Sequence, residues 1–247
     1  MIKLSKRMKA VASMVTPGHV LADVGTDHGY VPISLVQRKK IPKAIAMDIN
    51  KGPLQRACEH IAEFQLEEFI ETRLSDGVKK LEVGEVDSIL IAGMGGELVI
   101  HILTDGMEVC RNATELILQP QSELEKVRQF LREKKFKIVD EDMVIEDGKY
   151  YPMMKVVPVE EDEFWENIPD EAIRACYMYG PVLLKNGNPS LRMFLVKQHK
   201  QLEKILKELE KQPESKKIAK RKHEVLDEIS LNESAYTILG AIKNAGI

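Results

Sequence analysis

The fold of this chain is decided by residues 20–30, which read VLADVGTDHGY. The first part, from Val20 to Val24, is a short apolar run of the kind that forms a buried strand. Gly25 and Gly29 then enclose a turn that leads into a helical pattern. Closely spaced glycines let backbone N–H groups approach a ligand, and a helix N-terminus favours a carboxylate or phosphate. We therefore predict a site for a nucleotide-like ligand at this turn.

The glycine spacing argues against a dinucleotide. The NAD fingerprint would place glycines at positions 25, 27 and 30. Asp27 and Tyr30 occupy two of these three positions. A pyrophosphate would meet a like charge at Asp27, whereas a ligand with a positive centre would not. The motif therefore favours a ligand that carries a positive centre.

Short apolar runs alternate with segments of helical length in the first part of the chain. After the first run, further runs occur at residues 44–49, 70–75, 86–92 and 115–119. This alternation is typical of a parallel sheet with helices on both faces. Two later extended runs, 137–146 and 150–159, flank Asp147-Gly148, which is a hairpin signal. The sequence predicts an α/β fold whose mostly parallel sheet ends in an antiparallel hairpin.

Acids or glycines follow each of the first four runs. Asp48 ends the second run, Asp76 and Gly77 follow the third, and Gly93 begins a glycine-rich segment after the fourth. An acid after the second strand can accept hydrogen bonds from a ribose diol, and one after the third can accept from an exocyclic amine. Because open α/β sheets bind ligands at the carboxyl ends of their strands, we expect one ligand site at this edge.

These motifs carry a resemblance to a known class of enzymes. The segment DVGTDHG, residues 23–29, resembles the first motif of the class I S-adenosylmethionine-dependent methyltransferases. Asp48 and Asp76 match the ribose-binding and adenine-side acids of that class, and residues 93–96 match its fourth motif. The hairpin also matches that fold, whose seventh strand runs antiparallel. The resemblance implies a Rossmann-like class I methyltransferase sheet with S-adenosylmethionine as the cofactor.

Longer strings narrow the resemblance to one family. GTDHGYVP at 25–32, AGMGG at 92–96 and LQPQ at 118–121 are similar to the bacterial tRNA (adenine-22-N1)-methyltransferases, the TrmK family. The similarity extends into the C-terminal segment and implies methyl transfer to N1 of adenine 22, with tRNA as the partner. Two features depart from the broader class: Asp27 replaces the middle glycine, and the Asn/Asp-Pro-Pro-aromatic string of many amino-directed enzymes is missing. The second departure fits a ring nitrogen as the acceptor.

The implied reaction sets modest chemical demands. Adenine N1 has an in-plane lone pair and no proton to lose, so alignment and exclusion of water matter more than a strong base. The methylated base is cationic, and a carboxylate could stabilise its developing charge. We expect Asp27 to do this or else to contact the cofactor, and His28 and Tyr30 to border the base. Helix capping by His28 and core packing by Tyr30 are the alternatives.

Further site residues follow from the resemblance and from the charge pattern. The residues expected to bind the cofactor, with Met94 packing on its adenine ring, are Asp23, Gly25, Thr26, Asp27, Gly29, Asp48, Ile49, Asp76, Gly77, Gly93 and Met94. The residues expected to bind the RNA substrate are Gly95, Gly96, Gln119 and Pro120 near the strand ends, together with Lys3, Arg7, Lys204, Lys217 and Arg221.

The chain changes character near residue 160. Residues 160–171 contain acids but no Lys or Arg, so we place a domain boundary here, between a catalytic domain at 1–159 and a helical domain at 160–247. Gaps of four and three then separate the seam positions Leu191, Leu195, Gln198, Leu202, Ile205 and Leu209. Pro213 interrupts this spacing, which resumes from Ile218 to Ile229. The pattern predicts an antiparallel coiled-coil hairpin. Two ordinary helices packed on a core are the alternative.

Charge is distributed unevenly along the chain. The formal net charge is -3, from 36 basic and 39 acidic residues, which alone would argue against a nucleic-acid partner. Before Asp23, however, there are only bases, at Lys3, Lys6, Arg7 and Lys9. Segment 197–222 has ten bases and four acids, 10 - 4 = +6. Basic faces of this kind hold phosphates regardless of sequence, although a soluble coiled-coil surface is also rich in lysine.

Several classes of protein are excluded or disfavoured. The apolar runs are too short to span a membrane, and we expect no secretory signal and a cytoplasmic location. Cys58, Cys110 and Cys176 are widely spaced, which fits reduced thiols and gives no support for a metal site. We expect a monomer or a weak homodimer. The alternatives are a methyltransferase that acts on a small molecule or a protein, and a non-enzymatic protein whose coiled coil recruits a partner.

Overall fold

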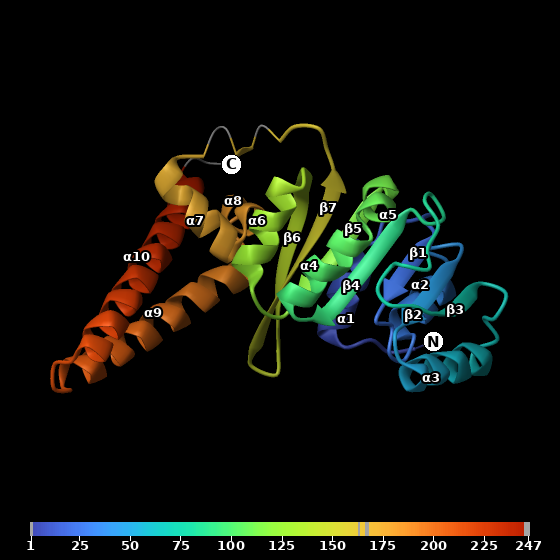
Figure 1. The fold of residues 1–247 in the computed structure, drawn as a ribbon, viewed down its shortest axis with the longest axis horizontal. Coiled ribbons are helices and arrows are strands. Elements are labelled where there is room, and N and C mark those ends of the chain that lie inside the picture. Colours follow the sequence, from blue (N-terminus) through green and yellow to red (C-terminus); the bar gives the residue numbers. More distant parts are fainter. Residues whose placement is uncertain (1, 163, 166–167, 245–247) are drawn as a thin grey trace. The chain divides into compact units, whose positions relative to one another are not determined.

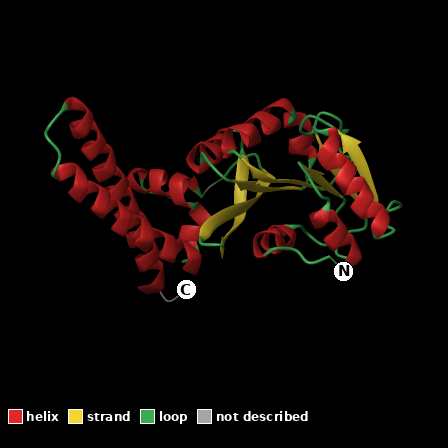
Figure 2. Ribbon diagram, turned by 90° about the horizontal axis from the view of Figure 1, so that it is seen from below, coloured by secondary structure: helices red, strands yellow, loops and turns green. Residues whose placement is uncertain are grey.

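The computed structural model describes residues 2–162, 164–165 and 168–244. The chain divides into two compact units, residues 1–162 and 163–247. The first unit contains all the strands of the described residues, and the second consists of helices and loops (Figures 1 and 2). The predicted α/β sheet followed by C-terminal helices is therefore confirmed.

The described residues form one seven-stranded sheet with the order β3-β2-β1-β4-β5-β7-β6. Strands β1 to β5 pair in parallel, and β7 runs antiparallel to both β5 and β6. The order reverses between β1 and β4, which is where open α/β sheets bind their ligands. The strands are β1 Leu21–Val24, β2 Ala44–Asp48, β3 Ile70–Leu74, β4 Ser88–Met94, β5 Glu115–Pro120, β6 Phe136–Glu146 and β7 Lys149–Pro158.

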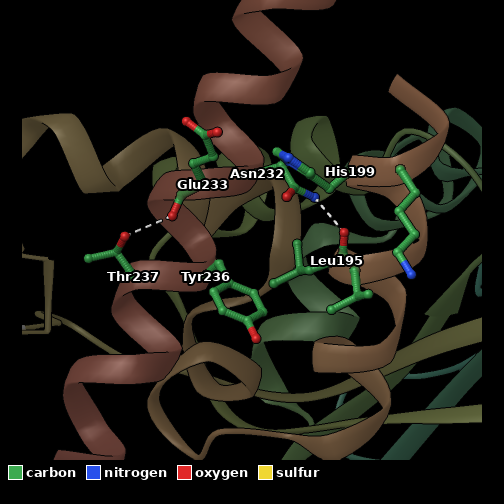
Figure 3. Close-up of a pocket in the computed structure, with 8 residues that line it drawn as sticks. Leu195, His199, Asn232, Glu233, Tyr236 and Thr237 are labelled. Atoms are coloured by element: carbon green, nitrogen blue, oxygen red, sulfur yellow. Dashed lines mark hydrogen bonds between the residues drawn. The ribbon is translucent and has the colours of Figure 1, made fainter. Parts of the chain in front are cut away.

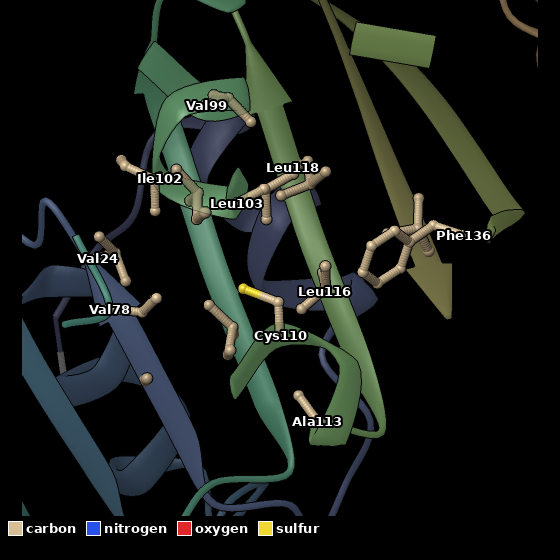
Figure 4. Close-up of a cluster of buried hydrophobic side chains, with 14 of the residues drawn as sticks. Val24, Val78, Val99, Ile102, Leu103, Cys110, Ala113, Leu116, Leu118 and Phe136 are labelled. Carbon is tan, nitrogen blue, oxygen red and sulfur yellow. The ribbon is translucent and has the colours of Figure 1, made fainter. Parts of the chain in front are cut away.

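Helices cover both faces of the sheet because its central strands are apolar on both sides. In β4, Ile89 and Ile91 join the core cluster beneath α4, α5 and α6, whereas Leu90 joins the cluster beneath α1, α2 and α3. Figure 4 shows the first cluster, where side chains of α4 and α5 meet those of β5. Successive side chains of a strand point to opposite faces, so a strand covered on both faces is a continuous apolar run.

The helices of the first unit are α1 Lys6–Met14, α2 Tyr30–Gln37, α3 Lys51–Glu63, α4 Gly96–Asp105, α5 Met107–Asn112 and α6 Leu124–Glu133. None of the three cysteines, all of which the structure describes, forms a disulfide bond, and Cys110 lies fully within the α4–α5 core cluster. Burial raises the pKa of its thiol to about 12, so Cys110 is a core residue rather than a reactive one.

The second unit is built on two long antiparallel helices. Its helices are α7 Asp170–Tyr179, α8 Pro181–Lys185, α9 Pro189–Glu210 and α10 Lys216–Asn244. Leu202 and Leu209 of α9 pack with Val225 of α10 in one apolar cluster. Nearby, the Asn232 side chain donates hydrogen bonds to the Leu195 carbonyl (3.1 Å) and to Gln198 Oε1 (3.0 Å). The one polar position of the predicted seam, Gln198, thus has a partner on the opposite helix.

Candidate functional site

The turn after β1 holds an unusual backbone. Gly25, Asp27 and Gly29 all have positive φ angles, of 75°, 51° and 70°. The amides of Gly25 and Thr26 both donate to the Met47 carbonyl, at 2.8 and 2.9 Å, which fixes the turn to β2. A Cβ atom at Gly25 would lie 2.2 Å from Met94 Cε. The Met94 side chain, from the end of β4, therefore extends across bare backbone at this turn.

Asp23 is the most perturbed acid at this edge. It is only 5% exposed, and Thr26 Oγ1 donates a hydrogen bond of 2.7 Å to its Oδ2. Burial raises the pKa of Asp23 to about 6, and the nearby charge of Asp48 adds to this, while the hydrogen bond from Thr26 opposes it. A positively charged group placed here would stabilise the ionised form, so Asp23 suits a cationic ligand.

The end of β2 carries the second acid of the site. Asp48 is 8% exposed and its Oδ1 accepts a hydrogen bond from the Asn50 amide at 2.8 Å. The following residue, Ile49, is 60% exposed, which is unusual for a large apolar side chain. The Ser75 amide donates to the Asp48 carbonyl at 2.9 Å, so the ends of β2 and β3 are held together. An acid that can accept hydrogen bonds from a ribose, next to an exposed apolar side chain that can pack on a base, suits a nucleoside.

Asp76 is engaged by neighbouring groups. Lys79 Nζ lies 2.6 Å from Asp76 Oδ2 and 2.9 Å from Asp105 Oδ2, so this lysine bridges the two acids. The next residue, Gly77, has a φ of 57°, and a Cβ there would lie 3.0 Å from Ile102. Gly77 is thus required by packing against α4. Lys79 contacts one oxygen of Asp76, whose side chain is 48% exposed and has further acceptor sites.

The glycine-rich segment after β4 divides into an open part and a packed part. Gly93 has a φ of 82° and is exposed, as is Gly95. Gly96 is buried, its amide donates to Ser122 Oγ at 3.2 Å, and a Cβ at this position would lie 2.4 Å from the Ser122 carbonyl oxygen. Gly96 therefore brings the start of α4 against the β5–α6 loop, and Gly93 and Gly95 leave backbone accessible.

Gln119 and Pro120 lie at the end of β5 but are not exposed. Gln119 is 0% exposed, and its Oε1 accepts a hydrogen bond of 2.8 Å from Arg7 Nη1. The Arg7 guanidinium lies 5.3 Å from the centre of the Tyr151 ring. A Cβ at Gly93 would be 3.5 Å from the same Arg7 nitrogen. Arg7 therefore covers Gln119 at the carboxyl edge and is the more accessible of the two.

Aromatic rings gather at the start of α2. His28 stacks on Tyr30 with ring centres 5.0 Å apart, and His60 of α3 lies 5.0 Å from Tyr30. Tyr30 is 38% exposed, so it does not belong to the buried core. Gly29, rather than His28, is the N-cap of α2 and no side chain caps this helix. His28 Nδ1 is a buried nitrogen with no hydrogen-bond partner among the described residues.

Helix α3 supplies two contacts to this turn that the sequence did not suggest. Arg56 Nη2 lies 2.6 Å from Asp27 Oδ1, and His60 Nδ1 lies 2.9 Å from the His28 carbonyl oxygen. Arg56 and His60 are four residues apart and so share a face of α3. This spacing is visible in the sequence, but it does not say which loop the face meets. Both side chains of this ion pair are about half exposed, so the contact holds the Asp27 carboxylate in place on the surface.

The remaining basic residues expected to bind RNA lie away from these strand ends in sequence. Lys3 is exposed before α1, and Lys204 and Lys217 are exposed on α9 and α10 of the second unit. Arg221 lies 3.0 Å from Glu224 and 3.3 Å from Glu228, so acids of its own helix engage it. Lys204 and Lys217 therefore present charge more openly than Arg221 does.

The second unit also contains a pocket that the sequence did not predict. It has a volume of about 400 Å³ and lies between α9 and α10 (Figure 3). His199 and Lys200 bring basic groups to one wall and Glu233 brings an acid to the other. The lining residues are Leu195, Val196, His199, Lys200, Asn232, Glu233, Tyr236 and Thr237. The pocket is mostly apolar and contains no residue of the sheet.

Two kinds of feature were not found in the part of the chain that the structure describes. No cluster of three or more His, Cys, Asp or Glu side chains there could hold a metal ion. None of the helices in the same residues combines the length and the apolar character needed to cross a membrane.

Comparison with known proteins gives consistent matches. Residues 4–154 match the family model of a methyltransferase domain. A tRNA (adenine(22)-N(1))-methyltransferase of Bacillus subtilis (strain 168) is 36% identical over 187 residues, which cover 76% of this chain and 77% of that protein.

Solved structures agree with these matches over more of the chain. The crystal structure of the B. subtilis m1A22 tRNA methyltransferase TrmK has a TM-score of 0.83 and 30% identity, and the match covers 95% of this chain and 99% of that one. A Streptococcus pneumoniae protein in complex with S-adenosyl-L-methionine has a TM-score of 0.80 and 32% identity, with coverage of 96% of this chain and 100% of that chain.

Proposed function

Since this chain belongs to the family of bacterial tRNA (adenine-22-N1)-methyltransferases, we propose that it transfers the methyl group of S-adenosylmethionine to N1 of adenine 22 in tRNA. The observation that carries this proposal is the pair of buried acids, Asp23 and Asp48, near the carboxyl ends of the adjacent strands β1 and β2, with the glycine turn directly after β1. The expected first motif, ribose-binding acid and fourth motif all lie at this one edge of the sheet.

The residues at this edge fit S-adenosylmethionine. Because Gly25 has no side chain, Met94 can lie against the backbone of the turn, where it offers an apolar surface for an adenine ring. Asp48 has a second oxygen available to accept from a ribose diol, as its position after β2 suggests. The buried carboxylate of Asp23 favours a positive charge nearby. When bound, S-adenosylmethionine supplies a methyl group on a positively charged sulfur.

On the substrate side, the residues of this chain mainly align the base and exclude water. His28 and Tyr30 form a stacked, partly exposed aromatic surface against which an extruded adenine can pack. Asp27 is paired with Arg56, which favours a part in holding the turn over one in stabilising the cationic product. The exposed Gly93 is the residue whose backbone carbonyl can face the developing charge, because the Gly95 carbonyl accepts a hydrogen bond from the Val99 amide.

Adenine N1 is hidden in a base pair, so the target must be unpaired or extruded and the body of the tRNA must be held elsewhere. We assign this to Lys3 in the first unit and to Lys204 and Lys217 in the second, through sequence-independent phosphate contacts. The same proposal includes a monomer or weak homodimer in the cytoplasm, which fits cysteines that form no disulfide bond.

Methylation of total tRNA tests this function. The purified protein is incubated with S-adenosylmethionine and tRNA, and the digested nucleosides are analysed for 1-methyladenosine. We expect this nucleoside in tRNAs that have adenine at position 22, and none when that position is changed to guanine. Methylation of another nucleoside, or of a tRNA lacking adenine 22, would overturn the assignment. Incorporation only into protein or small molecules would favour a different acceptor class.

A further inference from the structure

The N-terminus of α1 rests on an acid from a distant part of the chain. Glu146, the last residue of β6, accepts hydrogen bonds from Ser5 Oγ and from the Arg7 amide, each at 3.2 Å. Lys6 Nζ also donates to the Ile145 carbonyl, at 3.2 Å. The first turn of α1 contains no acid of its own. Glu146 therefore provides the negative charge that a helix N-terminus favours.

The charge state of Glu146 agrees with this geometry. Burial would raise the pKa of its carboxyl group, but hydrogen bonds from the amides of Arg7 and Lys6 and from Ser5 outweigh that effect and lower it. The ionised carboxylate is thus the form that the start of α1 selects. Ser5 remains the N-cap, with its side chain accepting from the Met8 amide at 3.3 Å, so the two acceptors serve different amides.

Arg7 is the residue of α1 whose side chain reaches the end of the sheet. Its amide is held by Glu146, its guanidinium donates to the buried Gln119 at 2.8 Å, and the same group lies over the Tyr151 ring. A guanidinium has five N–H donors, of which the contact with Gln119 uses one. Because Gly93 has no side chain, nothing from that residue separates Arg7 from the glycine-rich end of β4. Donors are thereby presented where the target nucleotide must enter.

We propose that Glu146 is a positioning residue for RNA binding, which anchors α1 so that Arg7 is held at the carboxyl edge to receive an acceptor oxygen or nitrogen of the target nucleotide. This rests on the proposed function in tRNA methylation. It gives the β6–β7 hairpin a task besides completing the sheet, because the hairpin holds the N-terminal segment in place. Glu146 itself touches neither substrate nor cofactor.

The test compares E146Q with a matched control on the same hairpin. Asp147 is the neighbouring acid, is exposed, and has a φ of 49°, which asparagine tolerates. D147N therefore removes the same charge next to the same strand without touching α1. We expect E146Q to raise the KM for tRNA three- to tenfold with kcat and the dissociation constant of S-adenosylmethionine within twofold. D147N should leave all three unchanged.

A double-mutant cycle separates positioning from general stability. If Glu146 acts through Arg7, R7Q with E146Q should raise the KM no further than R7Q alone. R7Q and E146Q should each reduce the dependence of log KM on log salt by about one unit of slope, because one cation is lost or misplaced. Multiplying effects in the double variant, or an E146Q enzyme with the KM of D147N, would overturn the proposal.

Hydrogen exchange provides a readout that does not depend on the reaction. The amide of Arg7 should exchange faster in E146Q than in wild type or D147N, since its acceptor is weakened. Equal exchange in the two variants would contradict anchoring by Glu146 even if tRNA were methylated. If the wild-type protein forms no 1-methyladenosine, the proposed function fails instead, and the exchange result still decides whether Glu146 holds α1.

Discussion

The two edges of the sheet each hold a buried carboxylate, and the two carboxylates differ in their hydrogen-bond and charge partners. At the amino edge, Glu115 begins β5 and is 3% exposed; at the carboxyl edge, Asp23 in β1 is 5% exposed. Glu115 lies 2.9 Å from Lys155 Nζ and accepts from the hydroxyl groups of Thr16 (2.6 Å) and Ser88 (2.7 Å). Asp23 accepts a hydrogen bond from the hydroxyl group of Thr26 and lies near the like charge of Asp48.

The pKa values reflect this difference. Burial acts to raise both, but in Glu115 the hydrogen bonds from Thr16, Lys155 and Ser88 outweigh it and lower the pKa. In Asp23 burial prevails and the pKa rises to about 6. Burial alone therefore does not mark a ligand site. A buried carboxylate that is paired with a cation and several hydrogen-bond donors stabilises the fold. A buried carboxylate without a cation, at the edge of a sheet, is suited to bind a positively charged ligand.

The largest effect should come from the amino edge. E115Q removes the charge that Lys155 and two hydroxyl groups share, and should lower the free energy of unfolding by about 2–4 kcal/mol, because it leaves a partly buried cation without its acid. Urea denaturation measures this. The dissociation constant of S-adenosylmethionine should stay within twofold.

The matched control for E115Q is E97Q, which breaks the ion pair between Glu97 of α4 and Lys126 of α6, where Glu97 is 71% exposed. It should give no resolvable change in the urea midpoint, because exposed pairs contribute little. Should E115Q and E97Q unfold at the same urea concentration, the amino edge would not carry the stabilising function assigned to it.

A substitution at the carboxyl edge should weaken cofactor binding and leave the free energy of unfolding intact. D23N keeps the shape of the side chain but loses the negative charge, so the dissociation constant of S-adenosylmethionine should rise about tenfold or more, which is roughly 1.4 kcal/mol. The free energy of unfolding at pH 7 should not fall, because a neutral amide avoids the cost of a buried charge. Calorimetry and urea denaturation measure the two quantities. A loss of stability as large as that of E115Q would erase the contrast between the edges.

The smallest effect is a pH dependence specific to Asp23. Its pKa in the ligand-free protein is raised from 3.8 to about 6, so the folded state holds this proton where the unfolded chain has lost it. Its contribution to stability therefore falls as pH rises from about 4 to 6. Affinity for a cationic ligand should rise over pH 5 to 7, by up to roughly tenfold per pH unit below the pKa. D23N should show a flatter profile, and parallel profiles would argue against Asp23 as the titrating group.

The comparison also explains what could be read from the sequence. Strand ends and glycine turns are local features, and Asp23, Gly25 and Asp48 were placed at one edge because parallel strands end together. The heptad spacing likewise identified Leu195 and Leu202 as buried positions of α9. Arg56 and His60 of α3 were missed, since their partners lie in a loop that precedes them in the chain by more than twenty residues.

The residues assigned to the RNA side show the same limit. Gln119 was expected to touch the target base and Asp76 to lie beside a ligand, and the sequence did not show that Arg7 contacts Gln119 or that Lys79 contacts Asp76. These pairings depend on which long side chains reach each other in three dimensions. No local pattern encodes them, because an arginine or a lysine can reach several acceptors and the fold decides among them.

By itself, the sequence predicted the succession of strands and helices along the chain, the hairpin, the seam of the long helices and the sheet edge where the acids and glycines gather. All of these follow from periodicity and from glycines, which act within a few residues. Only the tertiary structure decided that Glu115 is paired with a lysine whereas Asp23 has a raised pKa. It also decided that Glu146 accepts a hydrogen bond from the Arg7 amide, 139 residues away in the chain. A carboxylate's chemistry depends on the donors that folding brings to it, and those donors come from segments far apart in the chain.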